Sequence, residues 1–215
     1  MSIKKRNWPQ PTIYYPNVSL PITLVDPNVL PEVGDIMLSY SAGAPTKIIT
    51  WFTDSPFTHC ELLYGSPHGD PKTIAAGPVF WNILSKVRII PMRTMLDTHV
   101  AIWRHRDMNT EDRLHAVEWA DNEDGAPYAY LEYITYAYRK VFDKLLSYES
   151  DKNVGFVCSE FITYAYQEAM KKKGMSKEEY ERPFGFSPPN TAPGDIAKSS
   201  KCFKIAEYIP PTVQS

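Results

Sequence analysis

The sequence predicts an α+β protein, because segments with strand character and segments with helix character occupy different parts of the chain. Short segments rich in β-branched and aromatic residues lie between positions 59 and 104, and Gly, Pro or Asp separates them. Longer segments with apolar residues at helical spacing follow from about position 109. We therefore expect a small, mostly antiparallel sheet followed by helices that pack against it.

The composition is that of one globular domain of 215 residues. Hydrophobic residues make up 43% of the chain, enough to offset the entropy of ordering it. The formal net charge of -2 provides no overall attraction to nucleic acid, so we predict no nucleic-acid partner. The longest nearly apolar run, residues 46–52, is far shorter than the ~20 residues of a membrane-spanning helix, which predicts no transmembrane segment.

The N-terminal sequence and the cysteines indicate the cellular compartment of the protein. The first residues, MSIKKRNWPQPTIYYPN, have Pro and Asn where a secretory signal has an apolar segment, so we expect no signal peptide. Three cysteines without a C-x-x-C pair fit neither a disulfide framework nor a structural zinc site. These features favour a reducing compartment such as the cytoplasm, and they predict neither a metal nor a cofactor.

The N-terminal 31 residues are predicted to form an extended arm. Six of the 19 prolines fall within residues 1–31, and Pro blocks helix and removes backbone donors. The arm should have polyproline or edge-strand character and should wrap the body or contact a partner. Residues 32–215 then form a single domain.

Five short strands are expected along this domain. The first follows a turn at Gly34 and begins at Ile36. Residues 46–52 have mostly helical apolar spacing and predict a short helix between the first and second strands. The other strands are predicted at His59–Tyr64, Thr73–Ala76, Val87–Pro91 and Val100–Arg104.

Three helices are expected after the strands. The first has Asn109 as its N-cap and Asp112 in its first turn, and it ends near Gly125. The second covers roughly residues 128–146. The third covers Cys158–Lys173: its apolar residues share one face, three lysines at its C-terminus complement the helix dipole, and Gly174 follows it.

Cys158 is the candidate nucleophile, because it lies at the start of the third helix. Unpaired N–H groups and the positive end of the dipole favour its thiolate, and the same N–H groups can donate to an oxyanion. The alternative is a buried structural cysteine. Cys60 and Cys202 lack this placement: Cys60 is expected in the core, and Cys202 lies in a polar tail segment without an expected role.

His59 is the candidate base. The other four histidines, His68, His99, His105 and His115, occupy positions with turn, strand-flanking or exposed helical character that favour the surface. Period-two alternation places His59 and Glu61 on one face of a strand. A carboxylate there would hold the imidazole in the required tautomer, the third role in a Cys-His-acid site. Alternatively, Glu61 is a solvated strand residue.

Five sequence blocks, in order along the chain, resemble the circularly permuted branch of the NlpC-type papain-like thiol hydrolases. The relatives in this branch include the bacterial YiiX and YebB types and a poxvirus homologue, and more distantly the lecithin retinol acyltransferase-like enzymes. In this branch His precedes Cys, as His59 precedes Cys158 here. The blocks are Val33–Ile36, Ser55–Leu62, Gly125–Tyr128, Val157–Phe161 and Thr191–Ile196.

The resemblance implies a permuted papain-like fold, a small antiparallel sheet or half-barrel packed against helices, with Cys158 as nucleophile and His59 as base. Some relatives carry the third polar residue on the next strand, in a Val-Ile-Glu-Ala-like block, but residues 73–76 here contain no acid. Others carry a Glu two places after the His, which matches Glu61. A backbone carbonyl or another side chain is an alternative orienting group.

The expected activity is that of a cysteine amidase or peptidase that forms an acyl-enzyme. The resemblance implies a substrate with cell-wall peptide or acyl-amino-acid amide bonds. An acyltransferase or thioesterase acting on lipid is the enzymatic alternative. A catalytically silent binding or virion-associated protein of the same fold is the non-enzymatic one, suggested by the missing acid at residues 73–76 and by the long arm.

Overall fold

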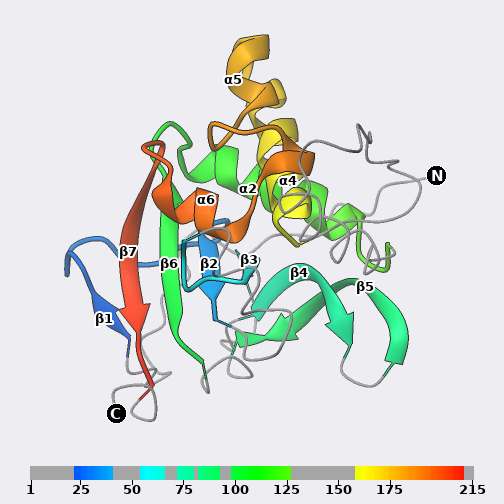
Figure 1. Cartoon of the computed structure of the whole chain (residues 1–215). Helices are drawn as coiled ribbons and strands as arrows, with labels where there is room; N and C mark the ends of the chain where they lie inside the picture. Colours follow the sequence, from blue (N-terminus) through cyan, green and yellow to red (C-terminus); the bar gives the residue numbers. More distant parts are fainter. Residues whose placement is uncertain are drawn as a thin grey trace.

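A seven-stranded antiparallel sheet organises the part of the chain that the computed structural model describes, residues 22–40, 54–65, 72–79, 82–92, 98–126 and 158–210 (Figure 1). The strand order is β1-β7-β6-β2-β3-β4-β5. This arrangement confirms the predicted α+β class. The strands are β1 (Thr23–Leu24), β2 (Ile36–Ser39), β3 (His59–Tyr64), β4 (Lys72–Val79), β5 (Asn82–Pro91), β6 (Val100–His105) and β7 (Cys202–Tyr208).

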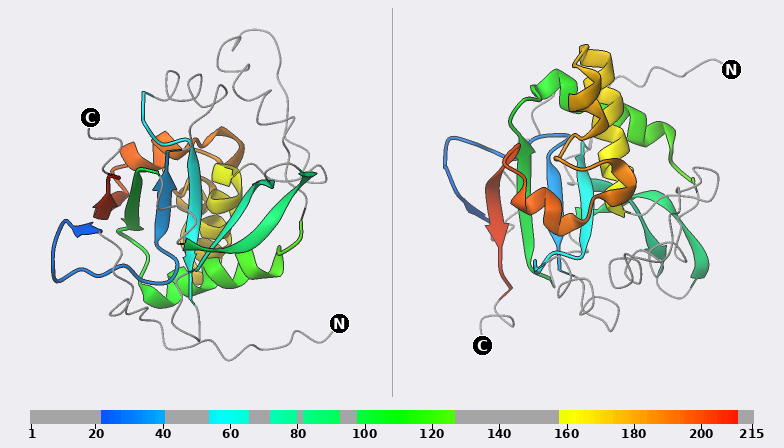
Figure 2. Two further views of the ribbon diagram at one scale, coloured as in Figure 1. Left: turned by 90° about the horizontal axis from the view of Figure 1, so that it is seen from below. Right: turned by 45° about the horizontal axis from the view of Figure 1, so that its top comes forward.

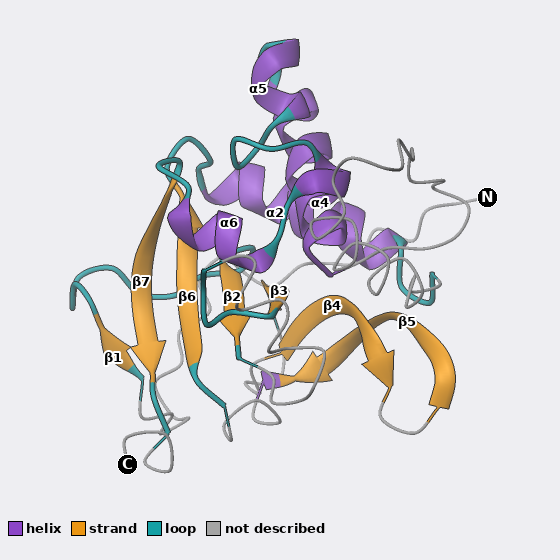
Figure 3. Cartoon of the chain, in the orientation of Figure 1, coloured by secondary structure: helices purple, strands orange, loops and turns teal. Residues whose placement is uncertain are grey.

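Helices pack beside this sheet as a separate layer, which Figure 2 shows from two directions and Figure 3 by secondary structure. The long helices α2 and α4 pack on each other and on β3 and β4. No helix in the described ranges is both long and apolar enough to cross a membrane. The helical elements are α2 (Thr110–Asn122), α4 (Cys158–Lys173), α5 (Lys177–Glu181), the 3₁₀ turn η2 (Pro188–Asn190) and α6 (Pro193–Lys198).

Strand alternation separates the two sides of the sheet. Ile36 and Leu38 of β2 face the helices and share one apolar cluster with residues of α2 and α4. Met37 and Leu63 point to the other side and join a second cluster with β6 and β7. The sheet therefore has apolar contacts on both faces, and the larger cluster holds the helices in place.

Most of the predicted elements that fall on described residues are confirmed. β3 has the predicted bounds, and α4 begins at Cys158 and ends at Lys173, as its amphipathic pattern and C-terminal lysines indicate. Asn109 caps α2 through a capping box with Asp112, although the helix ends at Asn122, slightly before the expected position. The expected helices at 46–52 and 128–146 lie outside the described residues.

Residues 22–31 are the described part of the predicted arm. Within them, β1 pairs with the outer side of β7 and forms one edge of the sheet. Residues 1–21 lie outside the described residues. The division into an arm and a single domain stays a prediction.

β7 was not expected, and Cys202 at its start is buried rather than part of a polar tail. The pairing of β6 with β7 shifts register between Ile102 and Trp103. Such an irregularity breaks strict alternation, which removes the period-two signal that would have identified the strand. The single lysine and the single glutamate of β7, Lys204 and Glu207, also resemble residues of a solvated tail.

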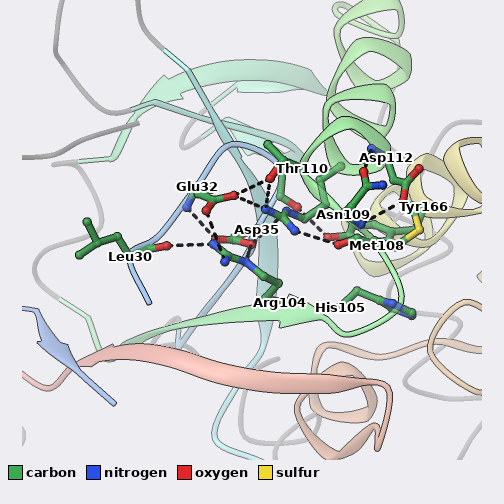
Figure 4. A network of polar contacts seen from close by, with 12 residues as sticks. Leu30, Glu32, Asp35, Arg104, His105, Met108, Asn109, Thr110, Asp112 and Tyr166 are labelled. Carbon is green, nitrogen blue, oxygen red and sulfur yellow. Dashed lines mark hydrogen bonds and ion pairs between the residues drawn. The ribbon is translucent and has the colours of Figure 1, made fainter. Parts of the chain in front are cut away.

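The turn before β2, which contains a buried carboxylate, connects four elements (Figure 4). Asp35 is fully buried and accepts two hydrogen bonds from Arg104 of β6, at 2.8 and 2.7 Å. Its carboxylate also forms an ion pair with Arg113 of α2 at 3.4 Å. The preceding residue, Gly34, accepts a hydrogen bond from the Tyr166 hydroxyl of α4 through its carbonyl oxygen, at 2.6 Å. The turn therefore fixes β2 relative to β6, α2 and α4.

His105, predicted at the surface, is buried at the end of β6 (Figure 4). Its Nε2 donates to the Pro183 carbonyl at 2.9 Å, and its Nδ1 accepts from the Asp107 N–H at 3.2 Å. Burial lowers the pKa of this imidazole, consistent with a neutral ring that both donates and accepts. Its ring packs against the rings of both Tyr166 and Phe184, which also contact each other, so His105 has a structural role.

The close approach of Gly34 to α2 predicts a large effect of Gly34→Ala on stability. Gly34 has φ +80°, and an added Cβ would lie 2.6 Å from the Arg113 carbonyl oxygen. The left-handed conformation and the overlap together should lower the free energy of unfolding by about 3 kcal/mol. Equilibrium unfolding in urea measures the change.

Gly174→Ala is the matched control for this prediction. Gly174 has φ +82°, but an added Cβ would meet nothing within 4 Å. Its cost should therefore be only the ~1 kcal/mol of the backbone conformation. Equal losses of stability in the two variants would contradict the assigned role of the contact between Gly34 and Arg113.

Candidate active site

The imidazole of His59 and the carboxylate of Glu61 form a pair at the beginning of β3. His59 is the first residue of the strand and lies opposite Ser39 of β2. The Nε2 atom of His59 is 3.1 Å from Oε1 of Glu61. The Glu61 side chain is 0% exposed, whereas the His59 side chain is 18% exposed. The carboxylate is thus fully enclosed, and the imidazole is the part of the pair that reaches solvent.

Cys158 approaches this pair from α4. It is the first residue of that helix and is buried, and it lies near enough to His59 for the charges of the two side chains to interact. Because Glu61 engages Nε2, Nδ1 is the ring nitrogen left for the sulfur. The structure therefore brings together the three residues that the sequence singled out, in the order carboxylate, imidazole, thiol.

The electrostatics of the site favour a thiolate and an imidazolium. Hydrogen bonding from Cys60 and the charge of His59 outweigh burial and hold the pKa of Cys158 well below its usual value. Burial alone would lower the pKa of His59, but the Cys158 thiolate and Glu61 raise it to about 10. At neutral pH the proton accordingly resides on the imidazole, which is the ionisation state that a cysteine nucleophile requires.

Glu61 is not the solvated strand residue that one interpretation of the sequence allowed. Its side chain is fully buried, and Oε2 has no hydrogen-bond partner among the residues that the structure describes. A buried carboxylate is costly unless a positive charge compensates it, and the imidazolium of His59 provides that charge. The contact with His59 therefore has an electrostatic reason as well as a geometric one.

Cys60 is the contact that sequence reasoning missed. It lies in the core, as predicted, but it is also near enough to Cys158 to help lower the pKa of that thiol. Strand alternation predicts that Cys60 points away from His59. It cannot predict that the N-terminus of α4, with Cys158, lies over the same face of the sheet as Cys60. The third thiol, Cys202, lies on β7, and burial raises its pKa to about 12.

The described residues contain no group of three or more His, Cys, Asp or Glu side chains arranged to hold a metal ion.

Comparison with known proteins identifies a fold. No protein-family model matches the sequence, and no curated protein matches it either. Among solved structures, the chain is similar to YiiX from Escherichia coli O157:H7, a DUF1105 protein described as a metalloprotein. The identity is 19%, the TM-score is 0.54, and the match covers 84% of this chain and 99% of YiiX. The chain thus has a YiiX-like α+β fold.

The ionisation of the site predicts which cysteine reacts first with iodoacetamide. Cys158 should be alkylated faster than Cys60 or Cys202 at neutral pH, because burial raises the pKa of both other thiols. Mass spectrometry of the native protein after short exposure measures the three rates. The Cys158 rate should reach a plateau well below pH 8 and rise again near pH 10, where His59 loses its proton. Equal rates for all three cysteines would contradict the assignment.

Glu61→Gln should shift the reactivity of Cys158 to higher pH. The substitution removes the negative charge that helps to raise the pKa of His59, so the imidazolium becomes a weaker partner for the thiolate. We expect the midpoint of alkylation to rise by about one pH unit, with the fold retained. The pH profile of the alkylation rate measures this shift.

Glu118→Gln is the matched control, because Glu118 forms a similar carboxylate-imidazole contact with His115, at 3.3 Å on the surface of α2. It should leave the Cys158 profile unchanged. An unchanged profile in Glu61→Gln would remove Glu61 from the site and leave a Cys-His pair.

Proposed function

We propose that this protein is a cysteine amidase or peptidase of the circularly permuted papain-like type, with Cys158 as nucleophile, His59 as acid and base, and Glu61 as the residue that orients the imidazole. One observation carries the proposal. A single histidine connects a buried carboxylate on its own strand to a thiol at the N-terminus of a helix. This is the arrangement that nucleophilic catalysis by cysteine needs.

The reaction follows from the positions of the protons. The Cys158 thiolate attacks the carbonyl carbon of the substrate, and N–H groups in the first turn of α4 lie where they can donate to the resulting oxyanion. The His59 imidazolium gives its proton to the leaving amine, and the C–N bond breaks to leave a thioester. Water then attacks the thioester while neutral His59 accepts its proton. The thiol leaves as thiolate, the imidazolium forms again, and a carboxylic acid is released.

Glu61 contributes through His59. Its Oε1 contacts Nε2, which leaves Nδ1 as the ring nitrogen that can serve the sulfur. The carboxylate also stabilises the imidazolium before the attack, when the proton is on the ring. Glu61 is therefore a positioning residue.

The substrate class comes from the resemblance to cell-wall hydrolases. We propose a cell-wall peptide or an acyl-amino-acid amide. Since His59 is the exposed member of the site, its side is the one from which a substrate reaches the sulfur. The N-terminal arm is proposed to contact a partner.

Two other functions use the same fold. Transfer of the acyl group to lipid or another nucleophile would follow the same first step, and addition of alternative amines and alcohols to the acyl-enzyme distinguishes transfer from hydrolysis. A silent binding or virion-associated protein was suggested by the lack of an acid at residues 73–76. The buried Glu61 beside His59 favours a catalytic function, because it supplies from β3 the carboxylate that residues 73–76 of β4 lack.

The decisive experiment incubates the protein with a panel of cell-wall peptides and N-acyl amino-acid amides and follows release of the amine. Cys158→Ala should abolish turnover, and the pH profile should fall as pH rises through about 10, because His59 then lacks the proton for the leaving group. Cys202→Ala should retain activity, since Cys202 lies on β7 and has no part in the reaction. Turnover that persists in Cys158→Ala would overturn the proposal.

A further inference from the structure

A second imidazole-carboxylate pair lies at the same end of the sheet as His59, and the proposed reaction does not use it. The Nε2 atom of His99 is 2.7 Å from Oε1 of Glu207 on β7. Lys204 donates from its Nζ to the other carboxylate oxygen, Oε2, at 2.6 Å. Partial burial alone would raise the pKa of Glu207, but the hydrogen bonds and charges of Lys204 and His99 lower it. The carboxylate is therefore a charged anchor for the His99 ring.

The sheet register places His99 two strands away from His59. Ser39, the last residue of β2, lies opposite His59 on β3 and opposite Val100 on β6. Neighbouring strands are ~4.8 Å apart, so the backbones of His59 and Val100 are separated by about 10 Å. His99 directly precedes Val100, and its carbonyl oxygen accepts a hydrogen bond from the Tyr40 N–H at 3.0 Å. This bond continues the pairing of β2 with β6 to the end of the sheet where β3 begins.

Phe57 spans the distance between the two histidines. The centroid of its ring is 5.3 Å from that of the His99 ring, with 48° between the ring planes. Phe57 is 6% exposed and belongs to the apolar cluster on the helix-covered side of the sheet. It lies two residues before His59, and the residue between them, Thr58, donates its N–H to the Ser39 carbonyl at 3.0 Å. The His99 ring thus contacts the segment that leads into β3.

The placement of this segment matters because His59 is the first residue of its strand. The residues of β3 are held by pairing with β2 and β4. Before His59, the backbone hydrogen bond of Thr58 and the packing of Phe57 against His99 hold the chain. A displacement of ~1 Å in a reacting group can lower a rate about a hundredfold. The contact with His99 therefore lies where a small movement would affect the imidazole of the site.

We propose that His99 is a positioning residue, which packs on Phe57 and thereby fixes the position of His59. The inference rests on the proposed function, because His59 is the acid and base of that reaction. Glu207 holds the Nε2 atom of His99 and so keeps the ring against Phe57. His99 acts through packing, so the role requires an aromatic ring at this position rather than a charge.

Three variants separate packing from charge. His99→Ala removes both the ring and the ion pair. His99→Phe keeps an aromatic ring against Phe57 and removes only the ion pair with Glu207. Phe57→Leu removes the aromatic partner and keeps an apolar side chain in the core, so this variant should fold. His115→Ala is the matched control, because it removes an imidazole that contacts a carboxylate on the surface of α2.

The experiment measures the rate of Cys158 alkylation by iodoacetamide against pH, together with the free energy of unfolding of each variant. His99→Ala should raise the midpoint of the alkylation profile by about one pH unit, which is a tenfold loss of thiolate at pH values below the midpoint. His99→Phe should keep the midpoint of the unmodified protein, and so should His115→Ala. In the Phe57→Leu background, His99→Ala should cause no further shift, because the two residues act through one contact.

Each outcome decides the inference. An unchanged midpoint in His99→Ala overturns it, whatever the loss of stability, because the role would then be structural. An equal shift in His99→Phe also overturns it, because the charge and not the packing would be responsible. A full additional shift from His99→Ala in the Phe57→Leu background overturns it as well, since His99 would then act by another route.

The unmodified protein tests the proposed function separately. A midpoint as high as that of a free thiol, ~8.5, overturns the proposed function together with the inference. A low midpoint that rises in Glu61→Gln but not in His99→Ala leaves the proposed function intact and rejects the role of His99 alone.

Discussion

The buried carboxylate of Asp35 is the constraint on which the rest of the fold depends. An isolated carboxylate at full burial is unfavourable, and burial raises its pKa even though Arg104 and Arg113 lie against it. Asp35 must therefore keep both guanidinium groups in place, and these come from β6 and α2. Removing either arginine would leave the buried charge with only one of its two compensating guanidinium groups. The charge requirement thus ties the middle of the sheet to a helix that covers it.

The position of Cys158 follows from the same turn. The Tyr166 hydroxyl donates to the carbonyl oxygen of Gly34, which precedes Asp35. Tyr166 lies about two helical turns, or ~12 Å, along α4 from Cys158. Fixing the helix at Tyr166 sets the position of its N-terminus, while the β2-β3 register places His59 opposite Ser39. The thiol and the imidazole therefore meet because one network orients the helix and one strand pair places the ring.

The sequence predicted the parts of this structure that local chemistry determines. The capping residues of α2, the amphipathic face of α4 and the bounds of β3 are each encoded within one segment, and so are the candidates Cys158, His59 and Glu61. The parts it did not predict depend on distant partners. β7 pairs through an irregular register, and His105 is buried because the Pro183 carbonyl and the Phe184 ring meet it from another segment.

The location of the acid is where the chain departs from some of the proteins it resembles. The sequence resemblance to permuted papain-like hydrolases predicts an acid on the strand after the histidine, at the position of Ala75. The pairing of Leu62 with Ile74 means that Ala75 and Glu61 face the same side of the sheet. An acid on either strand would therefore approach the imidazole from the same side. Ala75 is buried and carries no charge, and Glu61 supplies a carboxylate at 3.1 Å from the His59 ring. The missing acid on β4 is thus no argument against catalysis, because the electrostatic requirement of the imidazolium is met from the neighbouring strand.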